Sequence, residues 1–452
     1  MRIKTFTLNS KQEVISKIVR EILNLFKVEV IGSHGEADYL QLSVVNHQLT
    51  PSADGSGRGV KVESRLLLFD KGGNKQEFCR LDEGKGDERE AAARNRLIKL
   101  NLYHIFLEHL GAEAAPWGIL HGVRPTKIVH RWIRGGAGQQ EIIERIQEDY
   151  ACSREKADII VPMAFRQLPF LETSDDKTVS IYVGGGTPTS LPDAFFAEML
   201  EMVYNAFYKS DLAEFTVEAG RPDSITPEKI AAMKRFKVSR VSVNPQTMQA
   251  RTLQLIGRQH TPEAVAEMFH ALREAGLPHI NMDLILGLPG ETAEDVQDTL
   301  EKVTALEPDD ITLHALAIKR GSRLKLLMEE RHVELPSDEE TRRMSEVALG
   351  FMERGGYQPY YLYRQGYMSG DLENIGCARP GAEGMYNIQI MEEHQTIIGI
   401  GGSATTKVVD PVTGRLRSVF NAKDLATYLR DIDVYIEKRK HLLEEIYGNA
   451  SK

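Results

Sequence analysis

Residues that could do chemistry follow short apolar runs in the middle of the chain. The string GGGTPT, residues 184–189, comes directly after the run SIYV. In a parallel sheet, ligands bind at the carboxyl ends of strands, and glycine there lets backbone groups approach a ligand closely. The string therefore predicts a ligand-binding loop, and a tight turn between strand and helix is the alternative. It is not a phosphate-binding P-loop, because no Gly-Lys-Ser/Thr follows it.

Three polar residues occupy comparable places at later runs. Glu218 follows FTV, Gln246 follows VSVNP, and Asp283 lies within INMDLILGLPG. On a barrel such positions face one mouth, so two carboxylates and an amide could converge on an amine and hydroxyls of one small molecule. The alternative is that each is a strand-end polar group whose hydrogen bonds are satisfied within the protein.

The elements that must position these residues alternate between strands and helices. The runs TVSIYV, AEFTVEA, VSRVSV, HINMDLILG and DDITLHALAI predict five parallel strands between Thr178 and Ile318. Amphipathic helices separate them, and Thr261 and Thr292 are expected to cap two of these helices. The fold class is therefore α/β, with the βα units of a partial barrel.

Composition divides the chain further. Residues 1–165 contain both strand-like and helix-like sequence patterns, which predict an α+β domain. Residues 175–335 carry the βα units, and residues 336–452 form a C-terminal extension with a helix at SDEETRRMSEVALGFMERGG and a strand at QPYYLYRQ.

Charge and hydropathy exclude several classes of protein. The 452 residues carry a net charge of -9, which makes nucleic-acid binding an unfavoured function. No apolar run is long enough to span a membrane, and the N-terminal residues lack a signal peptide, so a cytoplasmic location is expected. The three cysteines are far apart in sequence, which argues against a disulfide framework. A basic segment could meet phosphates or carboxylates or be a solvated helix; it comprises His121, Arg124, Lys127, His130, Arg131 and Arg134.

The order of several strings resembles a known family. GGGTPTSL, VEAGRPDSI, SVNPQTM, IGRQHT and MDLILGLPGET are similar to the core of the HemN-like radical S-adenosylmethionine (SAM) enzymes, the oxygen-independent coproporphyrinogen-III oxidase group. WGILHGVRPTK and YYLYRQGYMSGDLENIGCARPG resemble the HemZ branch. This resemblance implies a radical SAM barrel of the (βα)6 type.

The resemblance also implies a set of SAM-binding residues. Gly185, Gly186 and Thr187 match positions at the methionine end of SAM, and Tyr182 matches either of two family tyrosines. The remaining matched positions are Glu218, Gln246, Arg258, Asp283 and Ala317. SAM carries an amine, a carboxylate and ribose hydroxyls. Acidic side chains, one arginine and a backbone that can approach the ligand closely are suitable partners for these groups.

One part of the family pattern is missing from this chain. The family carries a Cys-x-x-x-Cys-x-x-Cys loop after its first barrel strand, whose thiolates bind a 4Fe-4S cluster. Here SIYVG runs straight into GGTPTSL, which we interpret as a deletion of about fifty residues that hold the first βα unit, and no metal ligand is assigned. The loss of this βα unit is expected to leave one edge of the sheet unpaired, or to make the two halves of the barrel pair in a different way. It reflects either an internal deletion from an active enzyme or a natural relative that kept binding without redox chemistry.

The resemblance implies oxidative decarboxylation of coproporphyrinogen III to protoporphyrinogen IX. SAM would be the cofactor, and an electron donor would be a partner. Because the cluster cysteines are missing, we expect this chain to be inactive in that reaction. A haem or tetrapyrrole binding and trafficking protein is the alternative, and a SAM-binding protein with neither activity is a third. Candidate partners for substrate carboxylates are Arg124, Lys127, Arg323 and Arg364. Candidate haem ligands are His260, His270, His279 and His314.

Overall fold

The computed structural model describes residues 5–9, 13–26, 28–30, 38–51, 58–69, 74–86, 88–120, 124–172, 179–317, 330, 334–364 and 372–449. The chain divides into two compact units, Met1–Pro162 and Met163–Lys452. The predicted boundaries near residues 165–175 and 335–336 remain predictions. Thr178, Ile318, Arg323 and His121 fall outside the described residues.

The first unit is built on a five-stranded sheet with the order β2-β1-β3-β4-β5. Its strands are β1 (Thr5–Asn9), β2 (Glu29–Val30), β3 (Asp38–Pro51), β4 (Arg58–Phe69) and β5 (Lys75–Glu83). Its helices are α1 (Glu13–Leu25), α2 (Glu90–Leu110), α3 (Pro125–Arg134), α4 (Gln139–Tyr150) and the start of α5 (Arg154–Leu171). Helix α2 packs on β4 and β5, where Val62, Leu66 and Leu97 are almost fully buried. Burial of one face of the sheet by this helix gives the unit its core.

The second unit is built on a ten-stranded sheet with the order β11-β12-β10-β9-β8-β7-β6-β13-β14-β15. The five predicted strands are confirmed as β6 (Val179–Val183), β7 (Glu214–Gly220), β8 (Arg240–Gln246), β9 (His279–Leu286) and β10 (Asp310–Ala315), all parallel to their neighbours in that run. The remaining strands are β11 (Gln358–Tyr363), β12 (Asn374–Ala378), β13 (Thr396–Ile400), β14 (Thr405–Val409) and β15 (Leu416–Phe420). Strands from residues 336–452 therefore extend the same sheet at both ends.

Helices follow the strands in the expected alternation. They are α6 (Asp193–Phe207), α7 (Pro227–Arg235), α8 (Ala250–Leu255), α9 (Pro262–Glu274), α10 (Ala293–Thr304) and α12 (Asp338–Arg354), with short 3-10 turns η1 (Pro188–Ser190) and η2 (Pro222–Ser224). Both expected caps are confirmed, since Thr261 Oγ1 accepts from the amide of Ala264 and Thr292 Oγ1 accepts from that of Asp295. The C-terminal helices are α13 (Met385–Glu392), α14 (Leu425–Arg430) and α15 (Ile432–Asn449).

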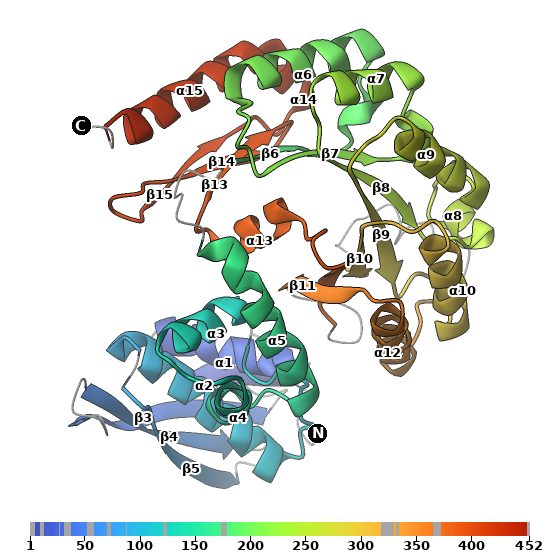
Figure 1. The fold of residues 1–452 in the computed structure, drawn as a ribbon. Helices are drawn as coiled ribbons and strands as arrows, with labels where there is room; N and C mark the ends of the chain where they lie inside the picture. Colours follow the sequence, from blue (N-terminus) through green and yellow to red (C-terminus); the bar gives the residue numbers. More distant parts are fainter. Residues whose placement is uncertain are drawn as a thin grey trace. The chain divides into compact units, whose positions relative to one another are not determined.

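The two faces of the central strands differ in chemistry because side chains alternate along a strand. Ile181, Val183, Val217, Val241 and Ile280 are fully buried on one face. Figure 1 shows helices such as α6, α7, α9 and α10 along the convex side of the curved sheet, and α13 within its concave side. The concave face carries polar residues, which places the candidate site there.

The edge that was expected to be unpaired is covered. Strand β13 pairs with β6 in parallel register, from Thr396 opposite Val179 to Ile400 opposite Val183. Strand β6 therefore has β7 on one side and β13 on the other. A missing first βα unit was expected either to leave this edge unpaired or to change how the barrel closes. The structure shows the second outcome, because β13 pairs with the edge of β6.

No helix in the described ranges is both long enough and apolar enough to cross a membrane.

Candidate functional site

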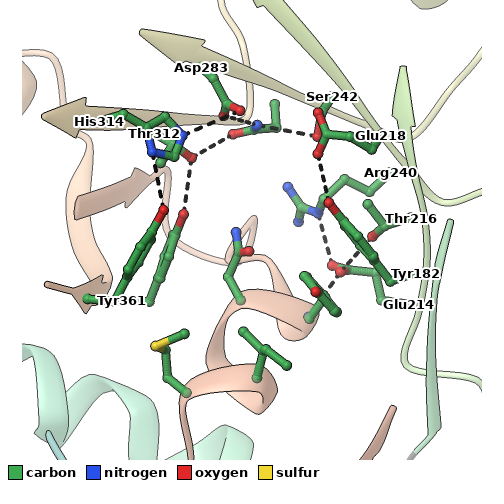
Figure 2. A pocket seen from close by; sticks show the side chains of 16 residues that line it. Tyr182, Glu214, Thr216, Glu218, Arg240, Ser242, Asp283, Thr312, His314 and Tyr361 are labelled. Atoms are coloured by element: carbon green, nitrogen blue, oxygen red, sulfur yellow. Dashed lines mark hydrogen bonds and ion pairs between the residues drawn. The ribbon is translucent and has the colours of Figure 1, made fainter. Parts of the chain in front are cut away.

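A cavity of about 260 Å³ opens on the concave face of the sheet. Side chains from β6, β7, β8, β9 and β10 line one side, and β11 and α13 line the other (Figure 2). Its volume is just below the roughly 300–1,000 Å³ usual for small-molecule sites. Three of the nine predicted SAM-binding residues line it, namely Tyr182, Glu218 and Asp283. The convergence expected from strand-end positions is therefore seen for the two carboxylates.

Each of these carboxylates has fixed hydrogen-bond donors. Glu218 accepts from the Tyr182 hydroxyl at 2.9 Å and from Asn244 Nδ2 at 2.7 Å. Asp283 accepts from Asn281 Nδ2 at 2.7 Å and lies 3.5 Å from His314 Nε2. Fixed donors hold the two carboxyl groups in place before any ligand arrives.

The two carboxyl groups titrate differently because their neighbours differ. Burial, and then the charge of Asp283, raises the pKa of Glu218 to about 7. Burial alone would raise the pKa of Asp283, but the hydrogen bond and charge of His314 lower it. The same contact raises the pKa of His314 against the opposing effect of burial. The site thus pairs a carboxylate that titrates near neutrality with an Asp283–His314 ion pair.

Aromatic rings form part of the cavity wall. Tyr182 and Tyr386 stack with ring centroids 3.8 Å apart and planes 6° from parallel. The Tyr361 hydroxyl donates to Thr312 Oγ1 at 3.4 Å, and the Tyr363 hydroxyl lies 3.5 Å from His314 Nδ1. A wall of tyrosine faces beside carboxylates suits an organic cation or a hydroxyl-rich ligand.

A buried ion network supports the floor of the cavity. Arg240 contacts Glu214 at 2.9 Å and Asp310, and its Nη2 donates to the Ala382 carbonyl at 2.8 Å. Burial alone would lower the pKa of Arg240, but the two carboxylates raise it. Burial raises the pKa of Asp310 to about 6, although Arg240 opposes the shift. The network links side chains of β7, β8 and β10 across the concave face of the sheet, in which β9 lies between β8 and β10.

Glu214 also positions α13. Its two carboxylate oxygens accept from the backbone amides of Met385 and Tyr386, each at 3.0 Å. A carboxylate at a helix N-terminus satisfies free amides and complements the helix dipole. Glu214 thereby places Tyr386 against Tyr182.

The glycine loop, residues 184–186, packs tightly against backbone at Gly185 and has free space at Gly186. A Cβ on Gly185 would collide with the carbonyl oxygen of Gly402, and a Cβ on Gly401 would collide with that of Gly184. Gly186 has φ of 127° and open space where a Cβ would stand. Glycine is thus required at residue 185 by packing against the loop after β13, while Gly186 leaves its backbone accessible.

The other predicted residues do not line the cavity. Thr187 precedes η1, Ala317 follows β10 by two residues, and Arg258 lies between α8 and α9. Gln246 ends β8 with φ of 69°, a left-handed conformation that is uncommon outside glycine. Their proposed contacts with SAM remain predictions.

The cysteines do not fit a 4Fe-4S cluster. All three lie within the described residues: Cys79 is exposed on β5, Cys152 is buried in the first unit, and Cys377 is buried in β12. Burial raises the pKa of Cys377 to about 12, which favours its thiol form. No group of three or more Cys, His, Asp or Glu residues in the described part of the chain is arranged to hold a metal ion.

The candidate haem ligands have other contacts. His314 faces Asp283 with one ring nitrogen and Tyr363 with the other. His260 Nε2 lies 3.3 Å from the Pro245 carbonyl, His279 lies 3.6 Å from Asp309, and His270 is beside Phe269. Of these four histidines only His314 lines the cavity, and both of its ring nitrogens face protein partners.

Several important residues were missed by the sequence interpretation. Asn244, Asn281, Glu214 and Arg240 all lie on the concave face, at even spacing from residues that were identified. Two-residue alternation such as Glu214, Thr216 and Glu218 was a readable signal. Tyr386 carried no such signal, because its helix lies far along the chain.

The class of protein follows from the central parallel strands and from a match to a family model. Residues 170–303 match the family model described as Radical SAM superfamily.

The particular family follows from a full-length likeness. The chain is 31% identical over 506 aligned positions to the oxygen-independent coproporphyrinogen-III oxidase-like protein HemZ of Bacillus subtilis strain 168, covering 96% of each chain. The chain therefore belongs to this HemZ-type family. It is also 30% identical to the heme chaperone HemW of the same organism, over 52% of this chain and 58% of HemW. The solved coproporphyrinogen III oxidase HemN of Escherichia coli gives a TM-score of 0.45 at 20% identity, covering 60% of this chain and 72% of HemN.

The HemZ alignment also bears on the missing segment. Because 96% of 452 residues is about 434, roughly 70 of the 506 aligned positions are gaps in this chain. HemZ therefore has residues that this chain lacks, and their absence from the SIYVGGGTPTSL string stays a prediction.

Proposed function

We propose that this chain is a HemZ-type protein that retains a binding site for a SAM-type ligand and does not itself decarboxylate coproporphyrinogen III. The observation that carries the proposal is the pairing of β13 with β6, where a strand bearing the cluster loop would be needed. The three dispersed cysteines support it, because a cluster of this kind needs three thiolates at one place. The family's oxidative reaction is therefore not assigned to this chain.

The cavity supports ligand binding in a specific way. Glu218 and Asp283 would accept hydrogen bonds from an amine or from ribose hydroxyls, and their fixed donors would limit the reorganisation needed. Tyr182 would hold Glu218 in position. Gly186, Thr187, Gln246, Arg258 and Ala317 would contribute at the strand ends, as the family resemblance implies. A tetrapyrrole remains the proposed second ligand.

Haem binding and trafficking is the alternative function. Similarity to heme chaperones supports it, although that likeness spans 52% of this chain. The engaged nitrogens of His314 and the limited cavity volume favour the first proposal over haem ligation on the concave face.

The first experiment is anaerobic reconstitution of the full chain with iron and sulfide, followed by iron quantitation and an absorbance scan. We expect no bound iron and no thiolate-to-iron band, as in a control with Cys79, Cys152 and Cys377 all replaced by serine. About four irons per wild-type chain, lost in the control, would overturn the cluster-free assignment.

The second experiment measures ligand binding by calorimetry. We expect SAM to bind without formation of 5'-deoxyadenosine under reducing conditions, and Asp283→Asn to weaken binding at least tenfold. Absence of SAM binding, together with a haem Soret band that is lost on a histidine substitution, would favour the trafficking function instead.

A further inference from the structure

A buried lysine contacts the loops that follow β6 and β7. Lys229 lies on α7 and is only 5% exposed, although lysine is among the residues least often buried in proteins. Its ammonium group donates to the backbone carbonyls of Thr189 at 2.6 Å and Ser224 at 3.0 Å. It also lies 3.2 Å from a carboxylate oxygen of Asp193, the first residue of α6. Each of the three N–H donors of the ammonium group therefore has an acceptor.

These contacts join two loops that come from different strands. Thr189 lies in η1, which follows the glycine loop after β6, and Ser224 lies in η2, which follows β7. The hydroxyl of Thr189 donates to the Ala219 carbonyl at 2.7 Å and lies 2.6 Å from the Ser224 hydroxyl. Thr189 is fully buried. Lys229 and Thr189 thus form a buried polar cluster whose hydrogen bonds fix the distance between the two loops.

The same two segments carry residues of the candidate binding site. Glu218 lines the cavity, and Thr187 is a predicted SAM-binding residue that precedes η1. A Cβ on Gly220 would stand 3.4 Å from Thr187 Oγ1 and 3.8 Å from Glu218 Oε1, so both side chains lie beside the same backbone position. Their separation depends on how the two loops are held together. Binding groups must be held to within about 0.5 Å of the productive geometry.

The ion pair with Asp193 does not account for the burial of the lysine. The Asp193 side chain is 40% exposed and also accepts from the Thr226 hydroxyl at 2.9 Å. An ion pair with an exposed carboxylate contributes little to stability, whereas burial of an ammonium group is costly unless its donors are used. The hydrogen bonds to the two loop carbonyls are therefore the contacts that distinguish Lys229 from a surface lysine.

We propose that Lys229 is a positioning residue for the binding site. It holds the loops after β6 and β7 at the separation that lets Thr187 and Glu218 contact one ligand. Lys229 does not line the cavity, so it acts through the loops. The proposal rests on the proposed function and adds to it a residue outside the set that the family resemblance implies. Because the glycine loop is predicted to contact the methionine end of SAM, loss of Lys229 should affect that end most.

Two measurements on the full chain test this role. Calorimetry compares SAM with 5'-methylthioadenosine, which lacks the amino-acid part of SAM. Hydrogen exchange follows the amides of residues 184–190 and 220–225. The variant is Lys229→Met, which keeps an apolar stem and removes the ammonium group. The control is Lys234→Met, at an exposed lysine of the same helix, and urea unfolding verifies that both variants are folded.

A positioning role predicts that Lys229→Met weakens SAM about 10–100-fold and leaves 5'-methylthioadenosine within about twofold of wild type, as expected for lost hydrogen bonds to a charged group. Exchange should speed up about tenfold in the two loops and stay unchanged in β9.

Three results would overturn the positioning role while the proposed function stands. They are equal losses for both ligands, faster exchange throughout the second unit, and no difference between Lys229→Met and Lys234→Met. A wild-type chain that binds neither ligand overturns the proposed function and the positioning role together.

Discussion

Tyr182 of β6 and Tyr386 of α13 stack face to face at 3.8 Å, although they are more than 200 residues apart in sequence. The same Tyr182 donates its hydroxyl to Glu218. The Tyr182 ring therefore links α13 to Glu218, so we expect a substitution of Tyr386 to change the surroundings of the Glu218 carboxylate.

We predict that Tyr386→Ala destabilises the protein by about 2–4 kcal/mol, because it removes a stacked ring and leaves a gap at the cavity wall. Tyr386→Phe keeps the stack and should cost less than about 1 kcal/mol. Urea unfolding of both variants checks this. Equal stabilities for Ala and Phe would show that the stack contributes little.

Glu218 should make stability depend on pH. Its pKa is 4.5 when unfolded and about 7 when folded, so its stabilising contribution is full below about pH 4.5 and is lost as the pH rises through about 7. Glu218→Gln should therefore gain about 1–3 kcal/mol relative to wild type between these values. Glu291 and Asp310 also have raised pKa values, but they are present in both proteins. Parallel curves of unfolding free energy against pH would contradict the assignment.

The buried Arg240 network gives a prediction with a larger effect. Arg240→Met leaves Glu214 and Asp310 buried without their cation, which should cost about 3–5 kcal/mol. The matched control is Arg235→Met, whose exposed pair with Glu201 at 3.7 Å should contribute less than about 1 kcal/mol. Chemical unfolding measures both. A loss for Arg240→Met no greater than that of the control would mean that the network does not stabilise the fold.

Gly184–Gly186 after β6 contacts Gly401 and Gly402 after β13, and this contact predicts that alanine destabilises the fold more at residue 401 than at residue 186. Gly401→Ala must displace the Gly184 carbonyl and adopt φ of 113°, so it should destabilise the β6–β13 pairing by more than about 2 kcal/mol. Gly186→Ala meets open space, so only backbone strain of about 1–2 kcal/mol is expected. Hydrogen exchange at the amides of β6 measures the pairing. Faster exchange in Gly186→Ala than in Gly401→Ala would reverse the argument.

Thiol accessibility tests the cysteine geometry. A thiol reagent should modify Cys79 quickly in the native chain and reach Cys152 and Cys377 only in denaturant, because those two are buried. Cys79→Ser is the control that should abolish the fast phase. Two or more fast thiols would contradict the described burial.

The sequence predicted the central strands well because each is an apolar run that carries a polar residue near its carboxyl end, as at Glu218 and Asp283, which line the cavity. The partner of β6 could not be predicted, because TIIGI at residues 396–400 looks like any short buried strand and pairing over such a distance leaves no local trace. Arg240 was read only as part of the strand VSRVSV, since its two carboxylate partners lie on other strands.

The pairing of β13 with β6 also governs when the fold can be completed. The outer edge of β6 stays open until residues 396–400 have been synthesised, more than 200 residues later. Such non-local pairing folds slowly, and an exposed strand edge is prone to intermolecular pairing in the meantime. During synthesis the second unit is thus expected to remain vulnerable to aggregation until nearly the whole chain has left the ribosome.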